Sequence, residues 1–529
     1  MFNIIPQPVK IDINCEKKGY TVSSNSKISQ HHTAYEFITF VKNALKKDIL
    51  IRNDGTENII LKTDSSYLYD EGYTIVCSDD TIVVTAKNDV GIFYAVQTLK
   101  QIFLQSDGVI PSFEIEDYPR FAYRGYLLDC GRYFFTVDEI KRIVDFIALH
   151  KFNVLHWHLT EDQGWRIEIK KYPLLTEKGS KRSHTNFNHK PHGGYYTQDD
   201  VKEIVAYCHA RKIKVIPEFD VPGHNVAAIA CYPYLSCFNR NLEVATHWGV
   251  KRDILCAGKE STYKFVYDVL DELIELFPDK IIHIGGDEAF KERWKICPHC
   301  QKAIKENNLK DEDDLQMYFM SKVNDYLKSK GYSSIMWGND TEGATDALSA
   351  DIAWTVYKPN CTEDAIKKEL ERGRKLINSR NKAYYLDFPY GWTSLKQVCD
   401  DNGALTENDN DTWGIEACMW TEYVPNMKKL EFLTFPRLGA ISENAWSPNG
   451  TATFEKFINK TDSYYKLLDV YNINYASLKK ACPSFVYKHA SSAWFKRRVF
   501  HWEGIHIFFD NKKVERMAKN TARRSKKNH

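Results

Sequence analysis

The sequence predicts an α/β protein in which a small α+β domain precedes a (β/α)8 TIM barrel. From residue 126 onward, short apolar runs recur, and each is followed by a segment with the apolar period of a helix. This regular alternation disfavours a β-sandwich or a helical bundle. Eight strands are predicted, the number that closes such a barrel: Tyr126–Asp129, Val154–Leu159, Lys214–Phe219, Ile281–Ile284, Ser334–Trp337, Ile352–Trp354, Ala383–Leu386 and Ile415–Met419.

Several of the intervening helices can be placed from the sequence. Val137–Leu149 begins behind Thr136, a good N-cap residue, and carries two acidic residues in its first turn. Asp199–Arg211 and Leu315–Lys330 show the 3.6-residue apolar period. Helices of this kind cover the outside of a barrel.

The chain divides into three parts. Residues 1–118 alternate β-rich runs with helical patterns at Ala34–Lys46 and Gly91–Phe103, which indicates a small α+β domain. Pro119 interrupts any regular element, and the pattern changes directly after it. We therefore expect the barrel at residues 119–470 and a C-terminal extension with a basic tail at residues 471–529.

The overall charge gives no reason to expect a nucleic-acid partner. The 529 residues carry a formal net charge of +2. From Lys496 to the end there are eleven Lys and Arg against three Asp and Glu, so the positive charge is concentrated in the tail. A solvated tail is the simpler reading, and binding of the tail to phosphates stays as the alternative.

The sequence predicts a cytoplasmic protein without a membrane segment. Its first residues lack a charged and apolar leader pattern, and no apolar run is long enough to span a bilayer. Thirteen scattered cysteines fit reduced thiols. Cys297-Pro-His-Cys300 could hold a metal with the help of His299, but no second cysteine pair with the usual spacing exists. Plain or redox-linked thiols are the leading reading there, so neither a metal nor a cofactor is predicted.

The stretch from residue 281 to residue 290 carries the clearest chemical signal. An apolar β-branched strand ends in two glycines, and Asp287 and Glu288 follow at once. Side chains at the carboxyl ends of barrel strands form the active site of this fold. Two adjacent carboxylates repel each other, so their pKa values should separate and leave one carboxyl able to donate a proton. A helix N-cap is the structural alternative.

Polar and aromatic residues follow each of the eight predicted strands. Aromatic faces stack on the C–H faces of a sugar, and charged side chains bind its hydroxyls. The set therefore predicts a carbohydrate site. Its members are Arg132, Glu161, Asp162, Asp220, His224, Asp287, Glu288, Trp337, Trp354, Tyr385, Asp387, Trp420 and Glu422.

At these residues the chain resembles family 20 glycoside hydrolases, the β-N-acetylhexosaminidases, over roughly Ile5 to Pro448. The order and spacing of six stretches carry the resemblance. These are Arg124-Gly-Tyr-Leu-Leu-Asp-Cys-Gly-Arg132, His156-Trp-His-Leu-Thr-Glu-Asp-Gln-Gly-Trp165, Glu218-Phe-Asp-Val-Pro-Gly-His224, His283-Ile-Gly-Gly-Asp-Glu288, Tyr385-Leu-Asp387 and Glu416-Ala-Cys-Met-Trp-Thr-Glu422. The segment before the barrel looks like the small domain of that family.

The resemblance implies exo-acting, substrate-assisted, retaining hydrolysis of terminal N-acetylglucosamine or N-acetylgalactosamine. It makes Glu288 the general acid and base, Asp287 the partner of the acetamido N–H, and Tyr385 the partner of the acetamido oxygen. The remaining implied roles fall into three groups. Trp337, Trp354 and Trp420 wall the pocket; Arg132, Asp387 and Glu422 bind hydroxyls; Glu161 and His224 support the acid.

The chain departs from a common family pattern at Glu161-Asp162, where Asp-Asp is usual. Two other readings stay open: a carbohydrate-binding protein that has lost catalysis, and a metal-dependent hydrolase that uses His156, His158 and the Cys297 loop. Trp392 is a candidate for stacking on the leaving-group sugar. The expected partners are N-acetylhexosamine-terminated glycans, and the sequence leaves the preferred sugar, the linkage and the oligomeric state open.

Overall fold

The computed structural model describes residues 2–23, 25–106, 108–185, 189–338, 348–358, 361–491 and 493. The predicted basic tail from Lys496 to the end lies outside these residues. So does the last part of the predicted C-terminal extension.

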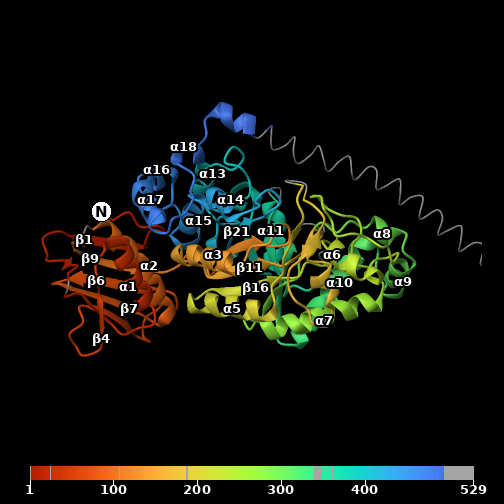
Figure 1. The fold of residues 1–529 in the computed structure, drawn as a ribbon, viewed down its shortest axis with the longest axis horizontal. Helices are drawn as coiled ribbons and strands as arrows, with labels where there is room; N and C mark the ends of the chain where they lie inside the picture. The colour runs from red at the N-terminus through yellow and green to blue at the C-terminus, as the bar shows by residue number, and fades with distance from the viewer. Residues whose placement is uncertain are drawn as a thin grey trace, which may run out of the picture.

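Within the described residues, eight parallel strands close a barrel, as the sequence predicted. It lies at the centre of the molecule in Figure 1. The strands follow the order β10 (Tyr123–Asp129), β11 (Val154–His158), β16 (Lys214–Glu218), β17 (Ile281–His283), β18 (Ser333–Gly338), β19 (Ala353–Val356), β20 (Leu376–Asn378) and β21 (Gly414–Met419). β10 pairs with β21 and so closes the ring.

The predicted position of the seventh strand, Ala383–Leu386, is wrong. β20 is formed by Leu376–Asn378 rather than by Ala383–Leu386. The N–H groups of Ala383 and Tyr384 both donate to the carbonyl of Arg380, so the chain makes one helical turn, α12 (Asn381–Tyr384). An apolar run this short fits a strand or a buried helical turn equally well, and tertiary pairing decides between them.

The predicted helices form around the barrel. α3 (Val137–Leu149) has the predicted bounds, and Thr136 and the third helical residue form a capping box. α5 (Gln198–Ala210) and α10 (Glu312–Ser329) lie within three residues of their predicted bounds. In the part of the chain that the structure describes, no helix combines the length and the apolar content needed to cross a bilayer.

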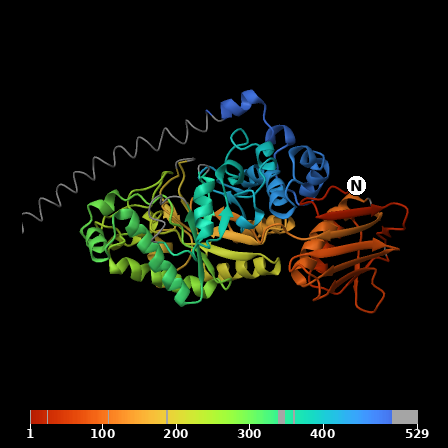
Figure 2. The same ribbon diagram turned by 180° about the vertical axis from the view of Figure 1, so that it is seen from behind.

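A seven-stranded sheet precedes the barrel. Its order is β1 (Lys10–Asn14), β9 (Ser112–Asp117), β6 (Tyr73–Ser78), β7 (Thr81–Ala86), β5 (Ile59–Thr63), β3 (Lys27–Ser29) and β4 (Leu50–Arg52). Helices α1 (Ala34–Leu45) and α2 (Asp89–Gln105) accompany it. This unit lies at one end of the molecule, and α2 lies on the side of the sheet that faces the barrel (Figures 1 and 2). The α+β part of the fold prediction is confirmed.

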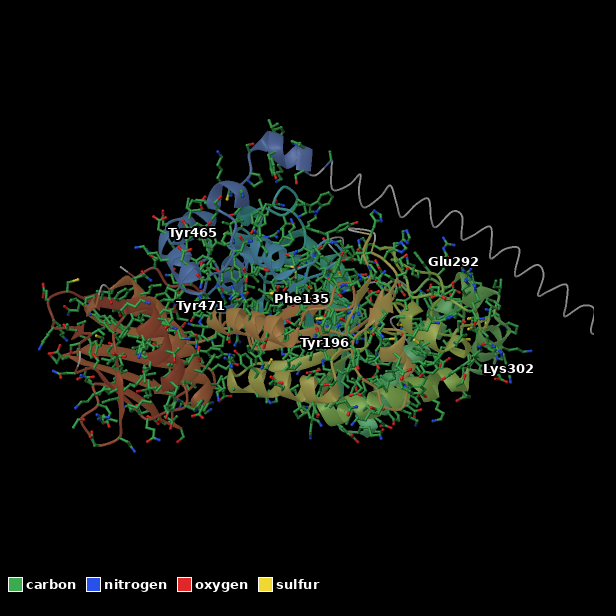
Figure 3. The ribbon with its side chains drawn as sticks, in the orientation of Figure 1. Phe135, Tyr196, Glu292, Lys302, Tyr465 and Tyr471 are labelled. Carbon is green, nitrogen blue, oxygen red and sulfur yellow. The ribbon has the colours of Figure 1, made fainter. Side chains whose placement is uncertain are left out.

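Buried charges join the sheet to the barrel. The Nζ atom of Lys151, directly behind α3, lies 2.8 Å from a carboxylate oxygen of Asp117 on β9, and neither side chain is exposed. Lys151 also donates to the hydroxyl of Tyr73 at 2.8 Å. Trp446, at the end of α15 (Arg437–Trp446), donates to the other oxygen of Asp117 at 2.9 Å. Tyr471, which follows α17 (Thr461–Val470) and is labelled in Figure 3, stacks on Phe40 of α1 and so adds a second contact to the sheet unit.

Replacing Lys151 by Met will strongly destabilise the protein, because the Asp117 carboxylate will stay buried without its cation. Loss of one partner of such a pair costs about 3–5 kcal/mol. The matched control is Lys367→Met, since Lys367 pairs with Glu363 on the exposed face of α11 (Glu363–Glu371). Thermal denaturation should give a large fall in midpoint for Lys151→Met and almost none for the control. Equal midpoints would contradict the role of the buried pair.

Candidate active site

A glycine turn brings the two adjacent carboxylates into the mouth of the barrel. After β17, Gly285 and Gly286 adopt φ values of 63° and 97°, the left-handed region that favours glycine. A Cβ at residue 285 would lie 1.7 Å from Oδ1 of Asp220. The N–H of Gly286 donates to the same oxygen at 3.0 Å. Asp220 therefore locks the turn that aims Asp287 and the following residue.

Glu288 has a φ of 48°, which is uncommon for a residue other than glycine. Strained backbone of this kind concentrates at functional sites, where surrounding structure holds it in place. The Glu288 side chain is 44% exposed, whereas that of Asp287 is 14% exposed. The carboxyl of Glu288 is thus open to solvent, and that of Asp287 lies deeper.

His224 links these carboxylates to a third one. Its Nδ1 lies 2.6 Å from a carboxylate oxygen of Glu161. Its Nε2 lies 3.8 Å from Asp287 and 3.6 Å from Glu288. The imidazole therefore lies between three acids. Burial lowers the pKa of His224, but Glu161, Asp220 and Asp287 outweigh it and hold the pKa well above its usual range.

Arg132 gathers residues from three strand ends. Its guanidinium lies 2.5 Å from Glu161 and 3.8 Å from Glu422. It also lies over the ring of Trp420, 5.1 Å from the centroid. Arg132, Glu161, Trp420 and Glu422 follow β10, β11 and β21, so the structure brings together residues that are far apart in the sequence.

The carboxyl groups of this site differ in pKa. Burial raises the pKa of Glu288 to about 7, with a further rise from Asp287 and a partial offset from His224. Burial also raises the pKa of Asp287. For Glu161, burial is outweighed by Arg132 and His224, which lower its pKa to about 2. The partly buried Glu288 is thus about half protonated near neutral pH, whereas the buried Glu161 stays charged.

Aromatic rings form one wall of the site. Trp337 packs against Trp420 and Tyr357, with ring centroids 5.6 Å apart in both pairs. The ring centroids of Tyr385 and Trp420 are 6.2 Å apart. The backbone of Tyr385 forms an isolated parallel β-bridge with Cys418 on β21. These rings share one apolar cluster at the mouth of the barrel. A sugar ring and its apolar substituents could pack against such a surface.

The structure does not bring Trp354 to this wall, which corrects its predicted place. In β19, Ala353 packs inside the barrel, so the next side chain faces outward. The ring of Trp354 packs under the guanidinium of Arg374, 4.5 Å from the centroid. Tyr357 takes the inward position instead, and sequence reasoning missed it. The alternation of 353, 355 and 357 was the signal that could have found it.

Tyr385, Asp387 and Glu422 close another side of the site. Arg437 of α15 donates to the carbonyl groups of Leu386 at 2.6 Å and Phe388 at 2.9 Å, which fixes the loop that carries Asp387. Burial raises the pKa of Asp387 well above its usual range, and Glu422 raises it further. The carboxyl oxygens of Asp387 can accept hydrogen bonds from hydroxyl groups of a ligand.

His156 and His158 belong to a buried network below the pocket. Nδ1 of His158 lies 2.5 Å from Glu218, and His156 lies 3.1 Å from both Glu218 and Glu416. Trp337 donates its indole N–H to Glu218 at 2.7 Å. Burial would lower the pKa of His156, but the two carboxylates raise it to about 10. The two imidazoles and the two carboxylates thus form a buried ion-pair network, and Glu218 of that network fixes the indole of Trp337.

Comparison with known proteins identifies the family. The model of the glycosyl hydrolase family 20 catalytic domain matches residues 121–449, more than half of the chain. The chain belongs to glycosyl hydrolase family 20. The model of domain 2 of the same family matches residues 1–118, which contain the seven-stranded sheet.

Family 20 relatives cover most of this chain. A β-hexosaminidase of Porphyromonas gingivalis is 38% identical over 427 residues, which are 77% of this chain and 55% of that protein. The chain thus spans about half the length of that relative. A β-hexosaminidase of Akkermansia muciniphila is 33% identical over 78% of this chain and 86% of its own length.

Solved family 20 structures share the fold. A β-N-acetylhexosaminidase from Bacteroides fragilis superposes with a TM-score of 0.78 at 31% identity and covers 91% of this chain and 99% of its own. A mutant β-hexosaminidase of Streptomyces plicatus, in complex with its product GlcNAc, has a TM-score of 0.79 at 29% identity. The match covers 90% of this chain and 96% of that one.

Replacing Glu161 by Gln will make stability less dependent on pH in the acid range. Because its pKa falls from 4.5 to about 2 on folding, ionised Glu161 contributes about 3 kcal/mol above pH 4.5, which is lost as the pH falls toward 2. Urea denaturation should therefore show a difference in the free energy of unfolding between wild type and variant. This difference should be largest near pH 6 and should decrease below pH 4.5. Glu177→Gln, an exposed residue of α4 (Leu174–Glu177), is the control. A gap of constant size would argue against this shift.

Proposed function

We propose that this chain is an exo-acting β-N-acetylhexosaminidase that releases terminal N-acetylglucosamine or N-acetylgalactosamine from glycans. The observation that carries the proposal is the carboxyl pair behind β17. Glu288 has a pKa of about 7 and reaches into an aromatic pocket, while Asp287 lies deeper beside it. Family membership supports the same assignment, since family 20 enzymes use the acetamido group of the substrate as the nucleophile.

In this proposal Glu288 is the general acid and base. Protonated near neutral pH, it gives its proton to the glycosidic oxygen as the bond to the leaving sugar breaks. Once it has lost that proton, the same carboxylate removes a proton from the water that attacks the intermediate. A pKa close to the working pH serves both steps.

Asp287 and Tyr385 would position the 2-acetamido group. The Asp287 carboxylate accepts the acetamido N–H and stabilises the positive oxazolinium that forms when the carbonyl oxygen attacks the anomeric carbon. Charge develops on this ring only in the transition state and the intermediate, so the buried carboxylate binds these species more strongly than the substrate. The Tyr385 hydroxyl would donate to the acetamido oxygen and hold it in line.

Exo-action follows from the way the site would hold the outer hydroxyl groups. Arg132, Asp387 and Glu422 offer charged or strongly polar partners for these hydroxyl groups. Trp337, Trp420 and Tyr357 would pack against the acetamido methyl group and the sugar face. A site that grips the hydroxyls of the last sugar this closely has no room for the chain to continue beyond it.

His224 and Glu161 would position the acid rather than touch the substrate. Glu161 stays ionised and holds His224 at 2.6 Å, and His224 in turn faces both carboxyl groups of the catalytic pair. The longer side chain of Glu161, compared with the Asp of the common pattern, still reaches both Arg132 and His224. Cytoplasmic location, the absence of a nucleic-acid partner and stacking by Trp392 stay predictions.

Replacing Glu288 by Gln should lower kcat by about 10²–10⁴-fold, because the proton donor is lost. The loss should be larger on N,N′-diacetylchitobiose than on the p-nitrophenyl glycoside, since nitrophenolate leaves without protonation. In the wild type, kcat/KM should fall as the pH rises above about 7, and this fall should be missing from the variant.

Glu292→Gln is the matched control for this experiment. Glu292 lies only four residues further on, in α8 (Glu292–Lys295), and its side chain is 45% exposed. The control should keep wild-type rates, and both variants should bind N-acetylglucosamine like the wild type in calorimetry. Turnover of diacetylchitobiose at near wild-type rate by Glu288→Gln would refute the assignment of the acid.

The acetamido group should be required for turnover. We expect hydrolysis of p-nitrophenyl N-acetyl-β-glucosaminide and no measurable hydrolysis of the plain β-glucoside, because only the former carries the internal nucleophile. Release of nitrophenol from the two compounds, measured in parallel, tests this. Equal hydrolysis of both would indicate an enzymic nucleophile, and hydrolysis of neither would favour a binding protein.

A further inference from the structure

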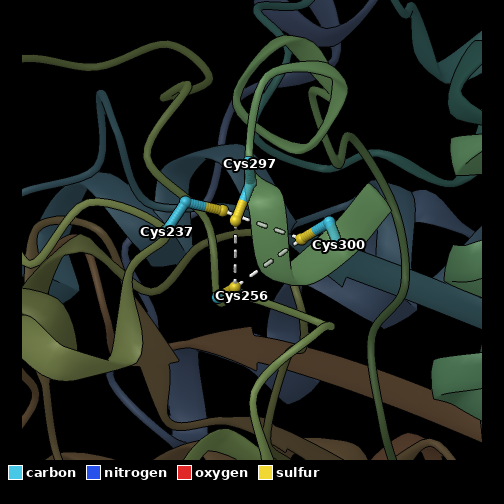
Figure 4. A group of neighbouring side chains, drawn as sticks. All are labelled: Cys237, Cys256, Cys297 and Cys300. Atoms are coloured by element: carbon cyan, nitrogen blue, oxygen red, sulfur yellow. Dashed lines mark hydrogen bonds between the residues drawn. The ribbon is translucent and has the colours of Figure 1, made fainter. Parts of the chain in front are cut away.

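Four buried cysteines from two loops meet at the end of the molecule away from the seven-stranded sheet. Their sulfur atoms all lie within 4.8 Å of one another (Figure 4). We call this group the four-cysteine cluster: Cys237, Cys256, Cys297 and Cys300. Two of its members form the Cys-x-x-Cys pair seen in the sequence, and the fold supplies the other two. The cluster lies outside the carboxylate and aromatic site described above.

The spacing of the sulfur atoms fits a metal better than disulfide bonds. The sulfur atoms are 3.9 Å apart in Cys237 and Cys300, 3.7 Å apart in Cys256 and Cys297, and 3.6 Å apart in Cys256 and Cys300. A disulfide needs about 2.05 Å between its sulfur atoms. In a tetrahedral site with Zn–S bonds of about 2.3 Å, the sulfur atoms stand roughly 3.8 Å apart. The cluster thus already has the dimensions of a ZnS4 site.

The local structure also suits thiolates. Cys297 is the N-cap residue of α9 (Pro298–Glu306), and Cys300 lies in its first turn. The positive end of the helix dipole favours negative charge there. All four side chains are at most 7% exposed, and His299 is exposed, so cysteine supplies the whole set. Four soft thiolates in a closed tetrahedron select zinc, whereas oxygen-binding cations prefer carboxylates.

We propose that the four-cysteine cluster binds one structural zinc ion. Because four protein ligands complete the tetrahedron, no position is left for water or substrate, and the ion takes no part in the chemistry. The site is independent of the proposed hydrolase activity. It also supplies the second pair of ligands that the sequence did not reveal, since Cys237 and Cys256 are single residues in a long loop.

The ion would fasten the loop that carries His224 to the loop that carries the catalytic pair. Cys237 and Cys256 belong to the segment between β16 and α7 (Glu260–Leu276), and Cys297 closes the segment behind β17. One direct contact already joins the two segments, since the Trp294 indole donates to the carbonyl of Leu255 at 3.0 Å. Within the first segment, the N–H of Leu255 donates to the carbonyl of Pro222 at 2.9 Å, two residues before His224. Zinc would thus fix the positions of the two loops relative to each other without lying in the site itself.

A very close backbone contact also joins these two loops. A Cβ at Gly258 would lie 2.2 Å from the carbonyl carbon of His299. The Asp253 carboxylate also bridges the two loops, 2.6 Å from Arg240 and 3.3 Å from Arg293. The two loops therefore approach each other closely enough for one ion to be shared between them, and glycine permits that approach.

The direct test is the metal content of the full chain, purified without chelator and dialysed against metal-free buffer. Plasma mass spectrometry should give one zinc per chain. Iron in place of zinc, or less than about one-tenth of an equivalent of zinc, would overturn the proposal. Thiol titration in denaturant with EDTA should find all thirteen thiols; a shortfall of two or four without bound metal would mean disulfides and would also overturn it.

Variants locate the ion. Cys300→Ser should reduce bound zinc at least tenfold, whereas Cys208→Ser, a buried thiol of α5 outside the cluster, should keep one equivalent. If Cys300→Ser does not fold, the wild type still decides: exchange of zinc for Co²⁺ should produce the sulfur-to-cobalt charge-transfer and d–d bands of a tetrahedral thiolate site. Octahedral cobalt bands, or full zinc retention by folded Cys300→Ser, would contradict the assignment.

Discussion

The site depends on one buried carboxylate shared by two cations. Glu161 binds Arg132 at 2.5 Å and His224 at 2.6 Å, and its side chain is 1% exposed. The cost of burying this charge is offset only while both partners are present. Arg132 then has a fixed position over Trp420, and His224 has a fixed position beside Asp287 and Glu288. The aromatic wall and this carboxyl pair thus both depend on the same interaction.

Much of this arrangement could be predicted from the sequence. The alternation of apolar runs with helical patterns predicted an α/β fold with parallel strands, and the number of eight strands favoured a closed barrel. Since the carboxyl ends of parallel strands meet at one rim, residues behind different strands had to converge. Arg132, Glu161, Trp420 and Glu422 do so. The roles assigned to them rest on the proposed reaction.

Other features depend on parity or on tertiary contacts that no local pattern reveals. Trp354 lies in β19, and Tyr357 follows that strand three positions later, so their side chains point to opposite faces. An error of one residue in the predicted register therefore exchanges the inward and outward side chains. β20 and α12 are both formed by short apolar runs, so the sequence alone does not distinguish the strand from the helical turn. Pairing with β21 makes Leu376–Asn378 the strand. Cys237 and Cys256 are separated by eighteen residues in the sequence, so only the folded loops bring their thiols together.

The Lys151 and Asp117 contact bears on how this protein could change in evolution. Asp117 belongs to the sheet, and Lys151 belongs to the barrel. Trp446, at the end of α15, adds a further contact from the barrel to Asp117. A barrel that lost residues 1–118 would leave an ammonium group against the Trp446 ring, 4.4 Å from its centroid, without a counter-ion. Recombination that swaps only one unit would need a partner with the complementary charge at the same place. The sheet and the barrel are therefore expected to pass between genomes as a single inherited block.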